Sequence, residues 1–318
     1  MSSSKIINLV GGRGYTGSEL LRLLAGHPQL ELGMASSRSL CGQRISQSCD
    51  GWPDDGKVFS SLEPQGVDAY PADAWVLALP NGLAAEWVEH IRNNFPEAVI
   101  LDLSADYRFD PGWTYGLPER FRARLKTARQ IANPGCYATG AQLGLLPLKE
   151  RLVSAPAIFG VSGFSGAGKT PSSRNDPDRL KDNLMPYALS GHVHEKEISF
   201  QLGGDVSFMP HVAAFFRGIS LTISFELDGE ISVDELLGTF QQAYGGEERI
   251  RVSLDMPEVA GIQGLPDAHI GGFTIDARNS ARGALVVVLD NLLKGAASQA
   301  LQNLNLALGL DEHTGINT

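Results

Sequence analysis

Residues 5–25 read KIINLVGGRGYTGSELLRLLA, and this stretch decides the fold of the first part of the chain. Residues 6–10 form a short apolar run that predicts a buried strand, and residues 18–25 have the apolar spacing of a helix. Between them lie three glycines in the spacing G-x-x-G-x-x-G, namely Gly11, Gly14 and Gly17. A strand, a glycine-rich turn and a helix in this order are typical of the first unit of a doubly wound α/β domain.

The following hundred residues continue this alternation. Apolar runs at 30–36, 75–79 and 98–103 predict three further buried strands, and residues 83–93 have helical spacing. Residues 41–71 are polar and rich in glycine and proline, which predicts a loop. Strands that alternate with helices at this spacing indicate a parallel sheet with crossover helices.

The pattern changes after about residue 150. Four stretches predict strands with few helices between them: residues 158–162, 198–202, 218–227 and 250–254. Residues 232–244 are expected to be helical, and residues 285–310 to form a buried run followed by a long amphipathic helix ending at Gly309. The expected architecture is therefore a doubly wound domain and an α+β domain. We assign residues 1–135 and 291–318 to the first domain and residues 136–290 to the second.

The composition limits what the chain does. Of 318 residues, 43% are hydrophobic and 19% are charged, so the chain can bury a core and global disorder is excluded. A net charge of −10 argues against a broad nucleic-acid interface, although one cluster of cations can still bind a small anion. Three cysteines do not make a disulfide framework, and no apolar run suggests a leader peptide or a membrane span. We therefore expect a cytoplasmic protein.

The glycine-rich turn predicts a dinucleotide site. Glycines let the backbone approach a pyrophosphate, and the N-terminus of the following helix favours anions. The candidate cofactor residues in this turn are Gly11, Arg13, Gly14, Tyr15, Thr16 and Gly17. The second strand ends in Ser36, Ser37 and Arg38, whose hydroxyls and cation suit a 2′-phosphate and favour NADP over NAD. A solvated arginine in a loop is the alternative interpretation of Arg38.

Residues 163–170 read GFSGAGKT, which matches the P-loop string G-x-x-x-x-G-K-[ST] and suggests a nucleotide triphosphatase. A P-loop must open directly into a helix, whereas Pro171 follows at once and residues 172–181 lack an apolar period. A glycine-rich loop here could equally line the nicotinamide half of a cofactor, with Ser165 and Gly166 as candidates.

Cys136 lies in the segment ANPGCYATG, residues 132–140, just where a helical pattern begins. The first turn of a helix lowers the pKa of a thiol, because the backbone N–H groups stabilise the thiolate. This setting favours a nucleophile over a small buried cysteine. Cys41 and Cys49 lie in a loop without such a setting.

Residues 192–197 read HVHEKE. If they begin a helix, His194 and Glu197 share one face, and the carboxylate can orient the imidazole as a general acid or base. A zinc site is the rival, but His192 and His194 have no third ligand nearby in the sequence, so we predict no metal. We expect His211 and His269 to be structural.

At these residues the chain resembles the N-acetyl-γ-glutamyl-phosphate reductase family. The resemblance rests on GGRGYTG and on segments across nearly the whole chain: residues 101–109, 133–147, 162–169, 192–198 and 290–305. It implies a Rossmann domain that binds NADP, and a substrate domain like those of glyceraldehyde-3-phosphate and aspartate-semialdehyde dehydrogenases. It also implies the NADPH-dependent reductive dephosphorylation of an acyl phosphate in arginine biosynthesis.

Candidate roles follow from the residues and the resemblance together. We expect Cys136 to attack the acyl phosphate and form a thioester, and His194, oriented by Glu197, to act as acid and base. His192 is the weaker candidate for that role and is assigned to the substrate. Ser104 and Arg108 would hold the substrate phosphate, with strand-end capping and a surface cation as the alternative. We expect Asn291 to help close the cofactor cleft.

Other functions remain open at this point. An aspartate-semialdehyde dehydrogenase or a lysine-pathway acyl-phosphate reductase would share the cysteine chemistry. A non-catalytic sensor of NADPH would keep the glycine-rich turn without needing a cysteine and histidine pair, and a P-loop nucleotide triphosphatase would use residues 163–170. A large open sheet in the second domain predicts a homo-oligomer, a dimer or a tetramer.

Overall fold

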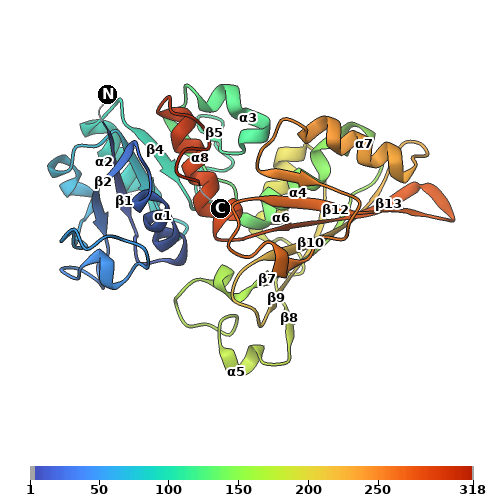
Figure 1. Ribbon diagram of the computed structural model, residues 1–318, viewed down its shortest axis with the longest axis horizontal. Coiled ribbons are helices and arrows are strands. Elements are labelled where there is room, and N and C mark those ends of the chain that lie inside the picture. Colours follow the sequence, from blue (N-terminus) through green and yellow to red (C-terminus); the bar gives the residue numbers. More distant parts are fainter. Residues whose placement is uncertain (1–3, 317–318) are drawn as a thin grey trace. The chain divides into compact units, whose positions relative to one another are not determined.

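The structure is a computed structural model that describes residues 4–316 and divides into two compact units (Figure 1). The first unit comprises the chain up to Gly135 and again from Ala296 onward, and the second comprises Cys136–Gly295. Within residues 4–316, no helix is long and apolar enough to cross a membrane.

The first unit is built on a six-stranded parallel sheet with the order β2-β1-β3-β4-β6-β5. Its strands are β1 (Lys5–Val10), β2 (Leu30–Ser36), β3 (Ala74–Leu77), β4 (Val99–Asp102), β5 (Thr114–Tyr115) and β6 (Gln130–Ala132). Its helices are α1 (Tyr15–Ala25), α2 (Ala84–Asn94), α3 (Pro118–Leu125) and α8 (Ser298–Ala307), with 3-10 turns η1 (Ile45–Gln47) and η2 (Pro64–Ala69). Because β1 pairs with both β2 and β3, the chain order reverses there, which is where doubly wound sheets bind ligands.

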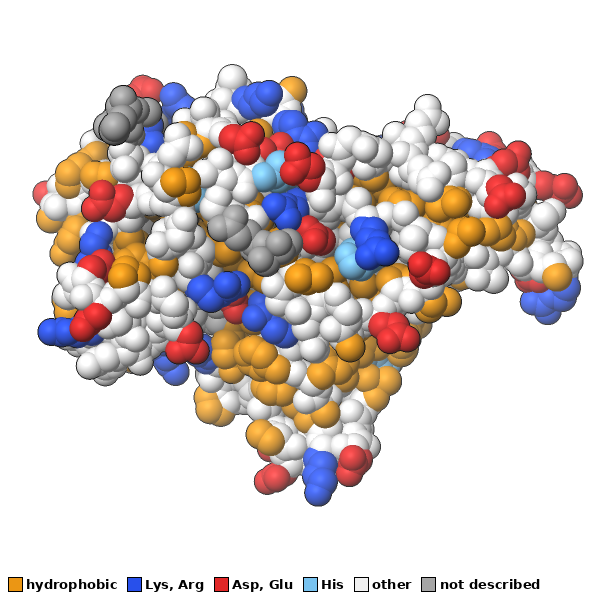
Figure 2. All heavy atoms as spheres, viewed as in Figure 1, with side chains coloured by type: hydrophobic (Ala, Val, Ile, Leu, Met, Phe, Trp, Pro, Cys, Tyr) orange, Lys and Arg blue, Asp and Glu red, His pale blue; other side chains and the backbone are white. Residues whose placement is uncertain are grey.

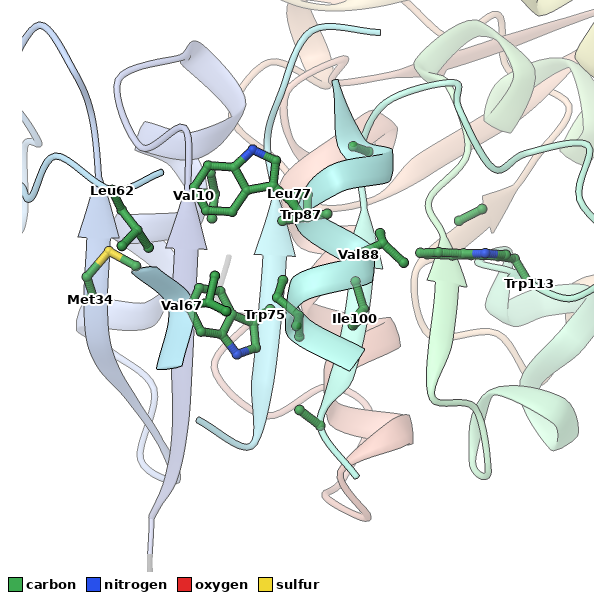
Figure 3. Close-up of a cluster of buried hydrophobic side chains, with 14 residues drawn as sticks. Val10, Met34, Leu62, Val67, Trp75, Leu77, Trp87, Val88, Ile100 and Trp113 are labelled. Atoms are coloured by element: carbon green, nitrogen blue, oxygen red, sulfur yellow. The ribbon is translucent and has the colours of Figure 1, made fainter. Parts of the chain in front are cut away.

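One face of this sheet buries a cluster of hydrophobic side chains under α2 and η2. Figure 3 shows Trp75 and Ile100 of the sheet beside Trp87 and Val88 of α2. Trp75 is completely buried, and its ring stacks on Phe95 with 6.2 Å between ring centres. Helices on both faces of a parallel sheet confirm the doubly wound prediction for this part of the chain.

The last helix, α8, corrects a prediction. The sequence suggested an amphipathic helix, but every residue of α8 is buried, the polar ones included: Ser298, Gln299, Gln302, Asn303 and Asn305. Buried polar groups need hydrogen-bond partners. Asn303 Nδ2 donates to Gly116 O at 2.9 Å and to Asn133 Oδ1 at 3.0 Å, and Asn305 Oδ1 lies 3.1 Å from His27 Nε2. The polar side of α8 therefore faces the protein.

The second unit contains a mixed seven-stranded sheet with the order β11-β12-β13-β10-β7-β9-β8. Its strands are β7 (Ala157–Gly163), β8 (Leu184–Pro186), β9 (Ser207–Ala213), β10 (Ile219–Glu226), β11 (Ile250–Val252), β12 (Ala268–Asp276) and β13 (Asn279–Leu289). Its helices are α4 (Cys136–Leu145), α5 (Pro177–Leu180), α6 (Val193–Leu202) and α7 (Val233–Tyr244). Short helical turns are η3 (Leu146–Arg151), η4 (Phe164–Ala167), η5 (Val259–Gly261) and the π-helical turn η6 (Leu293–Ala297).

Helix α4 packs very closely on this sheet. A Cβ added at Gly140 would lie 2.7 Å from a methyl group of Leu221, and one added at Gly144 would lie 2.6 Å from Ile223 Cδ1. Glycines at these two positions therefore let the helix approach β10. Since α4 begins with Cys136, this packing holds the cysteine at a defined place on the sheet.

Residues 198–202 were predicted to form a strand, and this prediction was wrong. They form the end of α6, which His192 caps and which ends at Gly203 in a left-handed conformation with φ of 73°. The alternation in ISFQL suggested a strand, but the buried Ile198 and Leu202 are four apart, which is a helical spacing. Strands β9 and β12 were not predicted, because Pro210 and a pair of glycines interrupt their apolar patterns.

Candidate active site

The glycine-rich turn of the first unit leaves the N-terminus of α1 open. Gly11 has φ of 90°, and a Cβ there would overlap Ala78 O; a Cβ at Gly17 would lie 2.7 Å from Gly11 O. At Gly14, however, an added Cβ would meet only Gly11 O, at 3.7 Å. Gly14 is also the N-cap of α1 and supplies no side-chain hydrogen bond to the first turn. Packing explains the other two glycines, whereas Gly14 leaves space beside the helix N-terminus.

A cavity of about 470 Å³ lies at the ends of β1 and β2. It is lined by Gly11, Arg13, Ser36, Ser37 and Arg38, together with Val10, Ser39, Leu62, Glu63, Pro64, Leu79, Pro80, Leu83, Glu86 and Trp87. The structure thus brings together five of the cofactor residues predicted from the sequence. Tyr15 and Thr16 are the first two residues of α1, beside this turn.

Arg38 makes a forked ion pair at the rim of this cavity. Its Nε and Nη2 donate to the two carboxylate oxygens of Glu63, at 3.1 and 2.9 Å, and both side chains are more than half exposed. Ser36 and Ser37 are buried, and their hydroxyl oxygens accept from Gly11 N at 3.4 Å and Leu40 N at 3.3 Å. The hydroxyls of the two serines therefore stabilise the backbone of the turn. The guanidinium of Arg38 is paired with the carboxylate of Glu63.

Cys136 is the first residue of α4 and is half-buried. The next residue, Tyr137, is almost completely buried, and its hydroxyl donates to His211 O at 2.8 Å. Gly295 also lies against Cys136, because a Cβ added at Gly295 would come within 2.7 Å of Cys136 Cβ. The thiol therefore lies at a helix N-terminus, as predicted, with neighbours that restrict its position.

The two histidines lie at the start of α6, which packs against α4. His192 is the N-cap, and its Nδ1 accepts a hydrogen bond from His194 N at 3.1 Å. An accepting Nδ1 places the ring hydrogen of neutral His192 on Nε2. Burial, and then the nearby charge of Arg174, lower the pKa of His192 from 6.5. His192 is therefore a neutral hydrogen-bond donor near neutral pH.

Ring contacts join Tyr137, the residue after Cys136, to the two histidines. The Tyr137 ring lies 5.8 Å from the His194 ring and 6.4 Å from the His192 ring, and the two histidine rings lie 4.9 Å apart. Tyr187 reaches the same place, with its ring 5.5 Å from His192. Burial, followed by the charge of Cys136, raises the pKa of Tyr187 to about 12. We call Cys136, Tyr137, Tyr187, His192 and His194 the cysteine–histidine cluster.

Glu197 lies on α6 one turn after His194, and its side chain is completely buried. The predicted helix, with both residues on one face, is therefore present. Among residues 4–316, no three His, Cys, Asp or Glu side chains are placed to hold a metal ion.

Residues 163–170 do not form a P-loop. Gly163 ends β7, η4 follows, and Gly168 turns the chain with φ of 79° before Pro171, so no helix opens at Lys169 or Thr170. The triphosphatase interpretation is therefore wrong on structural grounds.

Ser165 and Asn291 are joined inside the second unit. Asn291 Nδ2 donates to Ser165 Oγ at 2.9 Å, and its Oδ1 accepts from Gly218 N at 2.7 Å. The preceding residue, Asp290, is completely buried and pairs with both Nε and Nη2 of Arg217 at 2.5 and 3.1 Å. This network fixes the glycine-rich loop, including Gly166, to the end of β13.

Ser104 and Arg108 belong to the first unit, and both are buried. Ser104 Oγ donates to Asp102 at 2.6 Å and accepts from Asp106 N at 3.1 Å. Arg108 Nε donates to Asn133 O, and its Nη2 donates to Leu103 O, each at 3.0 Å. These bonds tie the end of β4 to the segment that leads to Cys136.

Tyr137, Tyr187, Arg174 and Gly295 are neighbours of the site that the sequence did not predict. Tyr137 adjoins Cys136 in the chain, so proximity alone could have indicated it. The other three reach the cluster only through the sheet and the turn after β13, and no spacing in the sequence relates them to Cys136.

Comparison with known proteins identifies the family of this chain. Residues 6–128 match the family described as semialdehyde dehydrogenase, NAD binding domain, and residues 136–291 match its dimerisation domain. N-acetyl-gamma-glutamyl-phosphate reductases of Xanthomonas campestris pv. campestris (strain 8004) and Stenotrophomonas maltophilia are each 51% identical to this chain; the alignments cover 98% and 99% of it and 98% of each relative. The chain belongs to the N-acetyl-gamma-glutamyl-phosphate reductase family. It is therefore an oxidoreductase of the semialdehyde dehydrogenase type, as predicted.

A longer relative and the solved structures extend this result. Protein arg-6, mitochondrial, of Neurospora crassa is 46% identical over 98% of this chain, which spans about a third (36%) of that protein. Aspartate semialdehyde dehydrogenase II of Vibrio cholerae, complexed with ASA, matches with a TM-score of 0.75 at 18% identity, over 96% of this chain and 98% of its own. This match confirms the predicted fold class, an α/β dinucleotide-binding domain with an α+β domain.

Proposed function

We propose that this chain reduces N-acetyl-L-glutamyl 5-phosphate to N-acetyl-L-glutamate 5-semialdehyde, with NADPH as the reductant, in arginine biosynthesis. One observation carries the proposal. Cys136 begins α4 beside the histidines that begin α6, in a chain half identical to named reductases over nearly its whole length. A cytoplasmic location, expected from the cysteine content, stays a prediction.

Cys136 is the proposed nucleophile. Its thiolate sulfur attacks the acyl carbon, the C–O bond to phosphate breaks, and inorganic phosphate leaves with the bonding electrons. The product of this step is a thioester on Cys136, which accepts hydride more readily than a carboxylate does. The position at the N-terminus of α4 supports the role, because helix N–H groups stabilise a thiolate.

His194 is the proposed acid and base. It protonates the thiohemiacetal oxygen as hydride adds, and it removes that proton when the aldehyde leaves and the thiol is restored. Glu197, buried one turn further along α6, orients His194. His192 uses Nδ1 to cap the helix, so we assign its Nε2–H to hydrogen bonding with the substrate oxygen.

The first unit has residues that fit a nicotinamide dinucleotide. The space beside Gly14 and the side-chain-free cap of α1 suit a pyrophosphate, and the 470 Å³ cavity takes in Gly11, Arg13, Ser36, Ser37 and Arg38. The dinucleotide, when bound, supplies the hydride. We propose NADP because Arg38 offers a forked cation to a 2′-phosphate in exchange for Glu63.

The remaining assignments are also proposals. Ser104 and Arg108 would contribute to holding the substrate phosphate from the segment they brace. Ser165 and Gly166 would line the nicotinamide side of the site. Asn291 would act there mainly by holding Ser165 in place, because its amide bonds that hydroxyl.

The reaction run in reverse tests the function. Purified protein, N-acetyl-L-glutamate 5-semialdehyde, NADP and phosphate should produce the near-ultraviolet absorbance of the reduced nicotinamide. L-aspartate 4-semialdehyde serves as the comparison substrate, and a Cys136→Ala variant as the control. If the folded wild-type protein does not reduce NADP, the proposal is refuted. If it prefers the aspartyl compound, the chain is instead an aspartate-semialdehyde dehydrogenase.

We also propose that the open face of the second sheet pairs with another copy of the chain. The matched dimerisation family covers this unit. Helices α4 and α7 cover one face, whereas Phe159 of β7 is 38% exposed on the other. Its cross-strand neighbours, Thr222 and Met209, share that face. Figure 2 shows hydrophobic side chains over the region of β7, β8 and β9.

Light scattering after size-exclusion chromatography tests this assembly. The wild-type chain should elute as a homo-oligomer, and Phe159→Glu should shift it toward the monomer, because a charge buried in an interface lacks a partner. Gln241→Glu, an exposed position on α7, which covers the opposite face of the sheet, is the matched control. A monomeric wild-type protein would contradict the proposal.

A further inference from the structure

Arg174 lies on the loop between η4 and α5 and contacts Tyr187 of the cysteine–histidine cluster. Its guanidinium carbon lies 4.9 Å from the centre of the Tyr187 ring, a cation–π geometry. The Tyr187 ring in turn lies 5.5 Å from His192. Arg174 is half-buried, and its charge is close enough to lower the pKa of His192. The loop therefore places a positive charge beside the proposed reacting groups.

The loop holds Arg174 in a defined place. Asn175 Nδ2 donates to Gly168 O and Thr170 O, each at 2.8 Å, and its Oδ1 accepts from Ser172 N at 2.7 Å. Arg174 N donates to Ser172 Oγ at 3.3 Å. These bonds close residues 168–175 into a compact turn, so the backbone under Arg174 is ordered before any ligand binds.

Tyr187 is also held, at some conformational cost. Its backbone N donates to Pro210 O at 3.2 Å, which fixes it against β9. The next residue, Ala188, has φ of 42°, in the left-handed region that residues other than glycine rarely adopt. Backbone strain of this kind concentrates at functional sites. The cation and the ring beneath it are thus both positioned by their surroundings.

We propose that Arg174 determines substrate specificity by binding the α-carboxylate of the acylated glutamyl substrate, while the Tyr187 ring supports its guanidinium. This inference rests on the proposed function. An arginine fork matches the two oxygens of a carboxylate. Arg174 then binds the carboxylate at one end of the substrate, and His192 lies near the reacting carbon at the other end, with Tyr187 between the two residues.

The spacing favours the carboxylate over the phosphate. In a glutamyl chain, four C–C bonds of about 1.5 Å each separate the carboxylate carbon from the reacting carbon by about 5 Å when extended. Arg174 is likewise set back from the reacting groups, because the Tyr187 ring, 4.9 Å from its guanidinium carbon and 5.5 Å from the His192 ring, is its contact with the cluster. The phosphate, in contrast, is bonded to the reacting carbon through one oxygen and must leave from beside the thiol.

Steady-state kinetics in the reverse direction test the proposal. Arg174→Gln should raise the KM for the semialdehyde about 10- to 100-fold, with kcat and the KM values for phosphate and NADP nearly unchanged, since it removes a charge-assisted hydrogen bond that the substrate makes in the ground and transition states alike. The KM of Arg174→Lys for the semialdehyde should lie between those of Arg174→Gln and the wild type. Arg179→Gln, an exposed position on α5, the helix that follows this loop, is the matched control and should behave as the wild type.

A substrate analogue identifies the group that Arg174 binds. The α-amide of the semialdehyde should be a poor substrate for the wild type, but Arg174→Gln should use the amide and the carboxylate about equally well. A rise in the KM for phosphate instead, or equal discrimination by variant and wild type, would overturn the proposal. Failure of the wild type to oxidise the semialdehyde would overturn the proposed function and this inference with it. Equal unfolding temperatures of Arg174→Gln and Arg179→Gln verify that the variants are folded.

Discussion

Gly295 lies directly against Cys136, and a single methyl group added at Gly295 would come within 2.7 Å of Cys136 Cβ. Real Cβ atoms do not approach this closely, so the helix that begins with Cys136 and the turn that contains Gly295 are fitted to each other. The position of the thiol thus depends on a residue more than a hundred and fifty positions away in the sequence.

Gly295→Ala is therefore expected to displace Cys136. We expect kcat to fall at least about 10-fold, because small displacements of reacting atoms are costly, and stability to fall by about 1 to 3 kcal/mol through overpacking. Turnover and denaturant unfolding measure the two effects. Gly238→Ala on α7, where an added Cβ meets nothing within 4 Å, should instead stabilise the helix slightly. Wild-type turnover by Gly295→Ala would contradict this view of the contact.

Cys136→Ser should lower turnover on the order of 10³-fold or more, because a serine hydroxyl in the same place is a far weaker nucleophile. Iodoacetamide should label Cys136 at neutral pH, and bound substrate should protect it. Cys41, which is exposed in a loop, is the internal control, and peptide mass spectrometry compares the two sites. Faster labelling of Cys41 than of Cys136 would argue against an activated thiol.

Arg38→Leu should raise the KM for NADP about 10- to 100-fold and leave the KM for NAD unchanged, since only NADP carries the 2′-phosphate. Glu63→Gln should lower the KM for NADP, because the carboxylate occupies the same guanidinium fork. Arg44→Leu removes a similar exposed pair with Asp54, outside the cavity, and is the matched control. Equal effects of Arg38→Leu on both dinucleotides would exclude the assignment of Arg38.

Asp290→Asn should destabilise the protein by about 3 to 5 kcal/mol, because it leaves the partly buried charge of Arg217 without its partner. Denaturant unfolding measures the loss. Asp228→Asn, which breaks an exposed pair with Arg151, should cost less than about 1 kcal/mol. Similar losses in both variants would show that the buried pair is no stronger than the exposed one.

His27 should make the protein sensitive to mild acid. Burial lowers the pKa of His27 from 6.5, against the raising effect of Asn305, and its Nδ1 accepts from Leu30 N at 2.8 Å. Below pH 6.5 the unfolded chain binds a proton that the folded chain resists. This part of the free energy of unfolding is therefore present above pH 6.5 and decreases, by up to about 1.4 kcal/mol per pH unit, until the folded-state pKa is reached.

Unfolding curves of the wild type and His27→Gln, recorded from pH 7.5 down to about pH 5, check this prediction. The variant loses the titrating ring, so its stability should depend less steeply on pH below 6.5. Parallel pH profiles would mean that His27 does not contribute.

Local patterns predicted the elements that carry the chemistry. The strand, glycine turn and helix around Gly14, and the helix that begins at Cys136, depend on neighbours within a few residues, so spacing and turn chemistry identify them. The strand prediction for residues 198–202 was wrong because these five residues alternate by chance. The N-cap at His192 and the C-cap at Gly203 show that they belong to a helix.

Long-range packing explains what the sequence did not indicate. Nothing in the sequence near α8 shows that Asn303 bonds to Gly116 and Asn133. The polar side of this helix was therefore predicted to face solvent, although it is buried. Tyr187 and Gly295 are likewise joined to the cluster only by the folded sheet. The roles assigned to the site residues therefore stay predictions until the variants are measured.

The complete burial of α8 has a consequence for protein synthesis. The first unit needs a helix that leaves the ribosome only after all of the second unit has been made. Until then the nascent chain carries the six strands of this sheet without α8, so the parts of α1, α3 and β4 that α8 covers are exposed to chaperones. A stop codon before position 298 would therefore remove the last helix of the first-made unit, and such a truncated polypeptide should aggregate or be degraded.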